Sequence, residues 1–251
     1  KFHLVSNMGT VIFTIFVLSL LTICFGAKLP KNWTACKVDE TMNECLKGAV
    51  QYALHDMIGG APSLGILPLD PLRFNTITID QGTGPVSIKL DFTDLDVLGV
   101  SNMQILSVDN DWKTMVIETQ APKIELKGNY KIAGNILVLP IQGNGECVLS
   151  MDNFIGHLKF HFSEKAAGSK VYNNIDKLDF TFDVDKLTMQ FDNLFNGDKA
   201  LGDNMNKFLN DNWKEILNEL KPNVARTFAA AFKEIGNRLF SKITKNQFIP
   251  A

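Results

Sequence analysis

Residues 201–243, LGDNMNKFLNDNWKEILNELKPNVARTFAAAFKEIGNRLFSKI, carry two consecutive amphipathic helical patterns that are joined at Pro222. Apolar side chains recur every three or four residues, which is the period of an α-helix with one buried face. The first stripe consists of Met205, Phe208, Leu209, Trp213, Ile216, Leu217 and Leu220, and the second of Val224, Phe228, Ala231, Phe232, Ile235, Leu239 and Ile243. Helices this apolar need other elements to cover them.

The preceding residues 73–195 supply that cover, because their apolar side chains recur with a period of two. The alternation is clearest at 86–92, 157–162 and 178–184. Such strands have one wet and one dry face, as in antiparallel sheets. Less regular strands are predicted at 74–80, 103–109, 113–120, 122–128, 130–139, 147–153 and 187–192. Short glycine-rich connections between them favour hairpins or a meander within one domain.

A further helix is predicted at residues 41–58, ahead of the strands. Thr41 and Glu44 have the spacing of a capping box, which makes Thr41 the expected N-cap. Gly59, Gly60 and Pro62 end the pattern. The expected inward face is Cys45, Leu46, Ala49, Val50, Ala53, Leu54, Met57 and Ile58.

Residues 10–27 form an uncharged apolar run that is followed at once by polar sequence. This pattern favours a secretory signal peptide spanning residues 1–27, with Met8 as the natural start and cleavage after Gly26 or Ala27. A transmembrane anchor is the alternative, because 18 apolar residues barely span a bilayer. The sequon that begins at Asn32 agrees with an extracellular, glycosylated protein.

Four cysteines are present, and Cys24 lies within the expected signal peptide. Cys36 and Cys45 are nine residues apart and are expected to form a disulfide in an oxidising compartment. Cys147 is then left over. Three interpretations remain for it: a buried free thiol, an intermolecular bridge, or a covalent contact with a ligand.

The sequence offers little support for nucleic-acid binding, metal binding or catalysis. Residues 28–251 hold 24 basic and 27 acidic side chains, a net charge of −3, without a basic cluster. His157 and His161 share one strand face about 13 Å apart, too far to share a metal ion. His55 is expected at the surface, and Ser63 lacks the context of a nucleophile elbow. A hydrolase whose residues come from distant loops stays open as an alternative.

Phenylalanine dominates the aromatic residues of the dry faces. Fourteen phenylalanines follow residue 27, against three tyrosines in the whole chain. Rings without a hydroxyl suit a lining that excludes water and offers few polar contacts. A Phe-rich but fully packed core is the alternative interpretation.

The order and spacing of several short motifs resemble the juvenile hormone binding protein / takeout family of secreted insect proteins. The motifs are Cys36 with Cys45, GAPSLGILPLDPL at 60–72, GNYKIAGNI at 128–136, LPIQGNG at 139–145, NLFNG at 193–197 and FLNDNW at 208–213. The resemblance implies an α+β fold, a curved antiparallel sheet rolled around a long C-terminal helix, with residues 28–251 as one domain. It also implies an internal tunnel for a hydrophobic ligand, and relatives among bactericidal/permeability-increasing and lipid-transfer proteins. The lone Cys147 favours the takeout branch, because hormone-binding members tend to carry a second cysteine pair.

We therefore expect a secreted, monomeric, non-enzymatic carrier of a terpenoid, fatty acid or other lipid, without cofactor and without stable membrane insertion. The candidate tunnel lining is Leu90, Phe92, Val97, Ile132, Val138, Phe160, Phe180, Phe182, Phe208, Ile216, Phe228 and Phe232. The glycine-rich stretch 59–65 is a candidate gate. A protein that binds membranes or envelope lipids, a secreted esterase and a domain with a filled core are the rival hypotheses.

Overall fold

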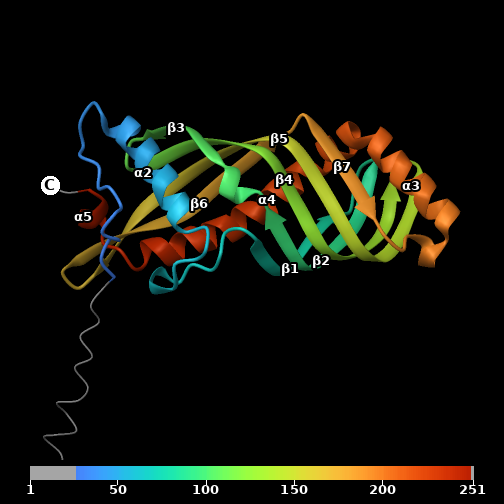
Figure 1. The fold of residues 1–251 in the computed structure, drawn as a ribbon, viewed down its shortest axis with the longest axis horizontal. Helices are drawn as coiled ribbons and strands as arrows, with labels where there is room; N and C mark the ends of the chain where they lie inside the picture. The colour runs from blue at the N-terminus through green and yellow to red at the C-terminus, as the bar shows by residue number, and fades with distance from the viewer. Residues whose placement is uncertain (1–26, 250–251) are drawn as a thin grey trace, which may run out of the picture.

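An antiparallel sheet of seven strands forms most of the molecule and curls lengthwise around a long helix (Figure 1). The computed structural model describes residues 27–249, so the expected signal peptide lies outside the described residues except for Ala27. The strands are β1 (Leu72–Gln81), β2 (Val86–Leu98), β3 (Gln104–Asn110), β4 (Thr114–Ile136), β5 (Leu139–Ala167), β6 (Lys170–Asp183) and β7 (Lys186–Phe191). This is the α+β roll that the sequence led us to expect.

Two very long strands, β4 and β5, run the length of the sheet and carry different neighbours at their two ends. The main order is β1-β2-β4-β5-β6, while β3 pairs with the first part of β4 and β7 with the middle of β5. Helix α4 (Trp213–Phe240) packs against both β6 and β1, the two ends of this order. The helix therefore lies inside the curl and closes it (Figure 1).

The sequence predicted more, shorter strands than the structure contains. The predicted strands 113–120, 122–128 and 130–139 are all parts of β4, apart from the last residues, and 147–153 and 157–162 both belong to β5. Some glycines that read as breaks lie between strands, such as Gly82 and Gly168, but those inside β4 and β5 lie where another part of the chain approaches closely. Gly134 has a φ of +142°, and a Cβ there would lie 2.2 Å from the Ser87 carbonyl oxygen. The prediction of a strand break at Gly134 was wrong, because glycine occurs inside strands where another backbone comes close as well as in turns.

The C-terminal helical region divides at Asn212 and not at Pro222, which corrects the sequence prediction. Helix α3 (Lys199–Asp211) ends where the side-chain amide and backbone N–H of Asn212 both donate to the Phe208 carbonyl oxygen. Pro222 lies inside α4. The carbonyl that loses its donor belongs to Asn218, an exposed residue, so water can replace the missing bond. Between residues 27 and 249, no helix is long and apolar enough to cross a membrane.

Helix α2 (Met42–Asp56) lies along β3 at one end of the sheet (Figure 1). Its Leu46, Val50 and Leu54 pack against a small cluster of buried side chains from β3 and β4. The capping box predicted at Thr41 is absent, because the Thr41 hydroxyl and N–H both donate to Asp39 Oδ1. A capping box would use the same hydroxyl and N–H of Thr41, and both are already bonded to the Asp39 carboxylate. At the other end of the chain, a short helix α5 (Lys245–Phe248) follows α4.

Side-chain amides from the helices cover parts of the open sheet edges. Each of these edge amides accepts from one strand N–H and donates to a carbonyl of the strand or of the residue just before it, as a neighbouring strand would. The edge amides and their strand partners are Asn206 with Phe191, Asn210 with Met189, Asn237 with Ile175, and Gln51 with Ile105 and Met103. They satisfy backbone groups that would otherwise be unpaired at edges.

The disulfide predicted between Cys36 and Cys45 is present and ties the N-terminal segment to α2. Replacing both cysteines by alanine is expected to lower the free energy of unfolding by about 2–3 kcal/mol, because the unfolded chain loses a closed loop. Urea unfolding of the wild-type and double-alanine proteins measures the difference. The reduced wild type should match the variant, and an unchanged midpoint in both would contradict the expectation.

Candidate functional site

The interior of the roll holds two neighbouring cavities. The larger, which we name the large chamber, has a volume of about 260 Å³. It lies among α2, the loop before β1, the sheet and α4. Its lining consists of Leu54, Leu69, Leu72, Val97, Val100, Met103, Thr119, Ile124, Leu126, Met151, Phe154, Leu158, Phe180, Phe182, Val224, Phe228, Phe232 and Ile235.

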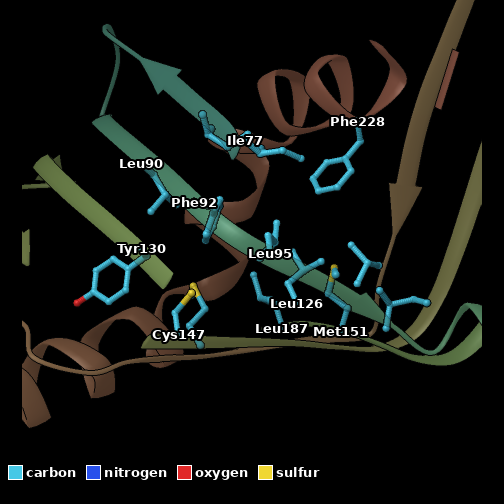
Figure 2. Close-up of a cluster of buried hydrophobic side chains, with 14 of the residues drawn as sticks. Ile77, Leu90, Phe92, Leu95, Leu126, Tyr130, Cys147, Met151, Leu187 and Phe228 are labelled. Atoms are coloured by element: carbon cyan, nitrogen blue, oxygen red, sulfur yellow. The ribbon is translucent and has the colours of Figure 1, made fainter. Parts of the chain in front are cut away.

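The second cavity, the small chamber, has a volume of about 100 Å³ and lies toward α3. Its lining consists of Ile79, Ile88, Leu90, Phe92, Leu126, Ile132, Ile136, Leu149, Met151, Phe182, Leu187, Met189, Phe191, Leu209, Ile216, Leu217, Leu220, Val224 and Phe228. The side chains that line both chambers form a waist between them, and they are Leu126, Met151, Phe182, Val224 and Phe228. Figure 2 shows Phe228 projecting from its helix into the interior that Leu126 and Met151 face from the sheet.

Aromatic side chains form one wall of the large chamber. Phe182 stacks between Phe154 and Phe180, with ring centroids 5.6 and 5.8 Å apart. Phe180 in turn meets Phe232 of α4 edge to face at 5.3 Å. Offset and edge-to-face contacts are the favoured geometries of aromatic pairs. The wall is therefore a continuous apolar surface from β5 through β6 to the helix.

The chambers are almost without polar groups. Thr119 is the one lining residue with a polar side chain, and its hydroxyl donates to the Gly156 carbonyl oxygen at 3.3 Å. None of the lining residues is titratable. A molecule inside is therefore held by shape and by its removal from water, without hydrogen bonds or charge pairs.

The histidines and the serine that were tested for chemistry lie away from the chambers. His161 Nε2 is 2.9 Å from Asp179 Oδ2, and His157 lies between Glu118 and Asp183. Because these positions alternate with inward-facing Leu158 and Phe160, they belong to the outer face of the sheet. His55 and Ser63 are exposed. Within residues 27–249, no group of three or more His, Cys, Asp or Glu side chains is placed to hold a metal ion.

Most of the sequence-predicted lining faces the chambers. The residues that do are Leu90, Phe92, Val97, Ile132, Phe180, Phe182, Ile216, Phe228 and Phe232. Val138 does not: it is 90% exposed in the turn between β4 and β5, so its assignment to the lining was wrong. Leu137 before it has a φ of +55°, and this turn ends the in-out alternation that the prediction extended.

Two other predicted lining residues pack elsewhere. Phe160 stacks on Phe162, with ring centroids 6.1 Å apart, and packs against two small clusters of buried side chains. Phe208 of α3 packs against the largest cluster of buried side chains but lines neither chamber. Sequence reasoning missed the waist residues Leu126 and Met151, since both fell in strands judged irregular. The alternation of Ile124 and Leu126 with Glu125 was the signal that places Leu126 inward.

The candidate gate at 59–65 forms a turn closed by paired Ala61 and Ile66, with Leu64 buried. It contributes no side chain to either chamber. Leu69 and Leu72, which follow it, line the large chamber. A gate in this loop would therefore act through these two leucines.

Cys147 is a buried free thiol that lines neither chamber. Its Sγ–H donates to the Gly128 carbonyl oxygen, and burial raises the pKa of the thiol from 9.0 to about 12. This environment favours the free-thiol interpretation over an intermolecular bridge or a ligand contact.

The native thiol of Cys147 is expected to react with a charged aromatic disulfide at least about 1000-fold more slowly than an exposed cysteine, since the thiolate is the reactive form. Release of the coloured thiol product measures the rate at pH 8. The same protein unfolded in guanidinium serves as control and should react fully. Rapid reaction of the folded protein would contradict the buried environment.

A curled antiparallel sheet closed by a helix, with a nearly all-apolar interior, defines an α+β roll protein with an internal apolar cavity. The family model described as haemolymph juvenile hormone binding protein (JHBP) matches residues 12–250. The chain belongs to this family, as the sequence motifs indicated.

Similar proteins agree with that assignment. The circadian clock-controlled protein daywake of Drosophila melanogaster is 24% identical over 244 residues, which cover 86% of this chain and 92% of daywake. Daywake of Drosophila yakuba is 23% identical, with 88% of each chain covered. The crystal structure of Epiphyas postvittana Takeout 1 is similar with a TM-score of 0.74 and 28% identity, covering 86% of this chain and 99% of Takeout 1.

Proposed function

We propose that this chain is a secreted, non-enzymatic carrier that holds a hydrophobic ligand in the two chambers. Suitable ligands are a juvenile-hormone-like terpenoid, a fatty acid or another lipid. The observation that carries the proposal is the pair of adjacent chambers that share the waist residues, because their combined lining offers one polar side chain and no charge. Membership of the JHBP family and the likeness to Takeout 1 support it.

The energetics favour such a ligand without any polar anchor. Removing about 300 Å² of apolar surface from water yields roughly 7–8 kcal/mol at about 25 cal/mol per Å². Lost translational and rotational freedom offsets about 4 kcal/mol or more of this. The remaining free energy of about 3–4 kcal/mol corresponds to a dissociation constant of about 1 mM, and a longer ligand that buries about 500 Å² would reach the micromolar range.

Extraction of the purified protein tests the proposal directly. Residues 28–251 are produced in a eukaryotic secretion host, the folded protein is extracted with organic solvent, and mass spectrometry identifies the lipids released. Protein stripped by unfolding and refolding is then titrated with a panel of terpenoids and fatty acids. Binding of at least one panel member with about one ligand per protein is expected. A correctly refolded protein that takes up none of them would overturn the proposal.

Secretion is tested separately, by expressing the chain from Met8 in insect cells. The secreted protein should begin at Ala27 or Lys28, following cleavage after Gly26 or Ala27. Asn32 is exposed, which suits a glycosylation acceptor. Asn32→Gln should therefore remove a glycan and increase mobility on a denaturing gel. Retention of the wild type inside the cell would contradict the secretory assignment.

A further inference from the structure

An open groove of about 850 Å³ runs between β6 and α4 on the outside of the roll. We name it the β6 seam. The groove has room because α4 presents small side chains there, among them Ala225 and Ala229. A helix packed against a sheet with larger residues would fill this space.

Polar contacts hold the β6 seam together at its two ends. At one end Asn237 bonds both backbone groups of Ile175, and Lys233 Nζ donates to the Asp176 carbonyl oxygen at 2.6 Å. At the other end Lys221 Nζ donates to Asp183 Oδ1 at 2.6 Å. Among the described residues, no hydrogen bond joins α4 to residues 177–182. This unbonded stretch spans roughly 20 Å of strand.

The β6 seam and the large chamber have one lining residue in common. Phe180 lines the groove on the outside and the large chamber on the inside. Its ring is half-buried and is held by aromatic contacts with Phe182 and Phe232, without a hydrogen bond. A change of the Phe180 rotamer would break no hydrogen bond, which makes this side chain the candidate barrier between groove and chamber.

The groove also carries a cation without a partner. Arg226 is exposed in the β6 seam and has no carboxylate within salt-bridge distance among residues 27–249. The acidic residues of the groove are already engaged, since Asp179 pairs with Lys177 and His161, and Asp176 accepts from Ser163 and Asn174. The free positive charge makes the groove suitable for an anion.

The opposite side of α4 offers a poorer route. The groove between β1 and α4, the β1 seam, measures about 350 Å³. The side chains that it shares with the large chamber are Leu69, Leu72 and Ile235. Its arginines are paired, Arg73 with Asp96 and Arg238 with Glu234. An entering tail would have to displace several side chains, and an anionic head would have to compete with a carboxylate.

We propose that the β6 seam is the portal and head-group site for a fatty carboxylate, whose tail passes Phe180 into the large chamber while its head stays beside Arg226. The proposal rests on the carrier function proposed above. The chambers supply no group that could compensate a buried carboxylate, so the charged end must remain in the wet groove. Arg226 then supplies a charge-assisted contact at that position.

Equilibrium binding tests the head-group site, with palmitic acid and its methyl ester as probes that displace a fluorescent lipid. Arg226→Gln should weaken palmitic acid roughly three- to tenfold and leave the ester unchanged. Arg238→Gln, the matched change in the β1 seam, should leave both unchanged. The difference in affinity between palmitic acid and its methyl ester should also become smaller in 1 M salt. Equal effects of Arg226→Gln on acid and ester, or a selective effect of Arg238→Gln, would overturn the head-group assignment.

Rates test the portal. Ala230 lines the β6 seam and its neighbour Ala231 lines the β1 seam, so the same substitution can obstruct either groove. Ala230→Trp should slow association of both probes at least fivefold, and Ala231→Trp should change it less than twofold. Phe180→Leu should accelerate dissociation at least threefold. Thermal melting of each variant confirms folding, and slowing by Ala231→Trp alone would assign entry to the other side.

The two proposals fail in distinguishable ways. If stripped wild type binds neither palmitic acid nor its ester nor any terpenoid, the carrier function is wrong. If the wild type binds them and the substitutions at Arg226, Ala230 and Phe180 have no effect on affinity or rate, the carrier stands and the portal is wrong.

Discussion

Asn206→Leu is expected to lower the free energy of unfolding by about 3–5 kcal/mol. The Asn206 side chain is 9% exposed; it accepts from Phe191 N–H at 2.9 Å and donates to the Phe191 carbonyl oxygen at 2.8 Å. Leucine has nearly the same shape and bonds to neither group. Each buried backbone group left without a partner costs about 1–3 kcal/mol. Chemical denaturation measures the loss.

Asn204→Leu is the matched control. Asn204 lies on the same helix, is exposed, and makes no side-chain hydrogen bond within the described part of the chain. Its replacement should change stability by less than about 0.5 kcal/mol. If both variants lose the same amount, the effect belongs to helix α3 in general and not to the edge contact with β7.

A second substitution at this site adds a pH signature. In Asn206→Asp, a protonated carboxyl can accept from the Phe191 N–H and donate to its carbonyl, whereas the carboxylate loses the donor and is buried. The pKa of the introduced carboxyl is therefore raised in the folded state. Its stabilising contribution is full below the pKa of about 4 in the unfolded chain and is lost as pH rises through the folded-state pKa. Stability relative to wild type that improves as pH rises would contradict this.

The periodicity of the sequence was sufficient to predict the type of each layer. Alternation at 86–92 and 178–184 placed Leu90, Phe92 and Phe182 inward, and the three-to-four spacing placed Ile216 and Phe228 on the inner face of the helix. These signals are local, because strand and helix geometry alone decide which side chains share a face. The same locality explains why residues such as Ile132 were placed correctly while their strand was divided in the wrong places.

The features that the sequence did not reveal depend on contacts between distant segments. Gly134 was predicted to break its strand. It must be glycine because a Cβ there would collide with the backbone of Ser87, which is far away in the sequence. The edge amides are polar side chains on helices that bond to backbone groups of the strands. Because every residue has these backbone groups, the sequence does not indicate which of them are bonded. The proposed portal at Phe180 rests on alanines of α4 that line the groove beside β6, and this packing has no signal in the sequence.

The waist between the chambers should decide how long a ligand the protein accepts. Val224 of α4 lines both chambers and is half-buried beside Phe228 and Phe182. Val224→Phe adds a ring at this point and should confine a ligand to the large chamber. A tail segment with about 100 Å² of apolar surface then stays in water, which costs about 2.5 kcal/mol. The affinity for a long-chain ligand should fall roughly 70-fold.

Ligand length separates this effect from a general loss of binding. A series of fatty acids from eight to twenty carbons, titrated against wild type and Val224→Phe, should diverge only beyond the length that fills the large chamber. Val224→Ala widens the waist and should retain the wild-type preference for long chains. Leu239→Phe, a substitution on the same helix outside both linings, controls for added bulk. A loss in Val224→Phe that is the same at every ligand length would contradict this expectation, because short ligands never need to cross the waist.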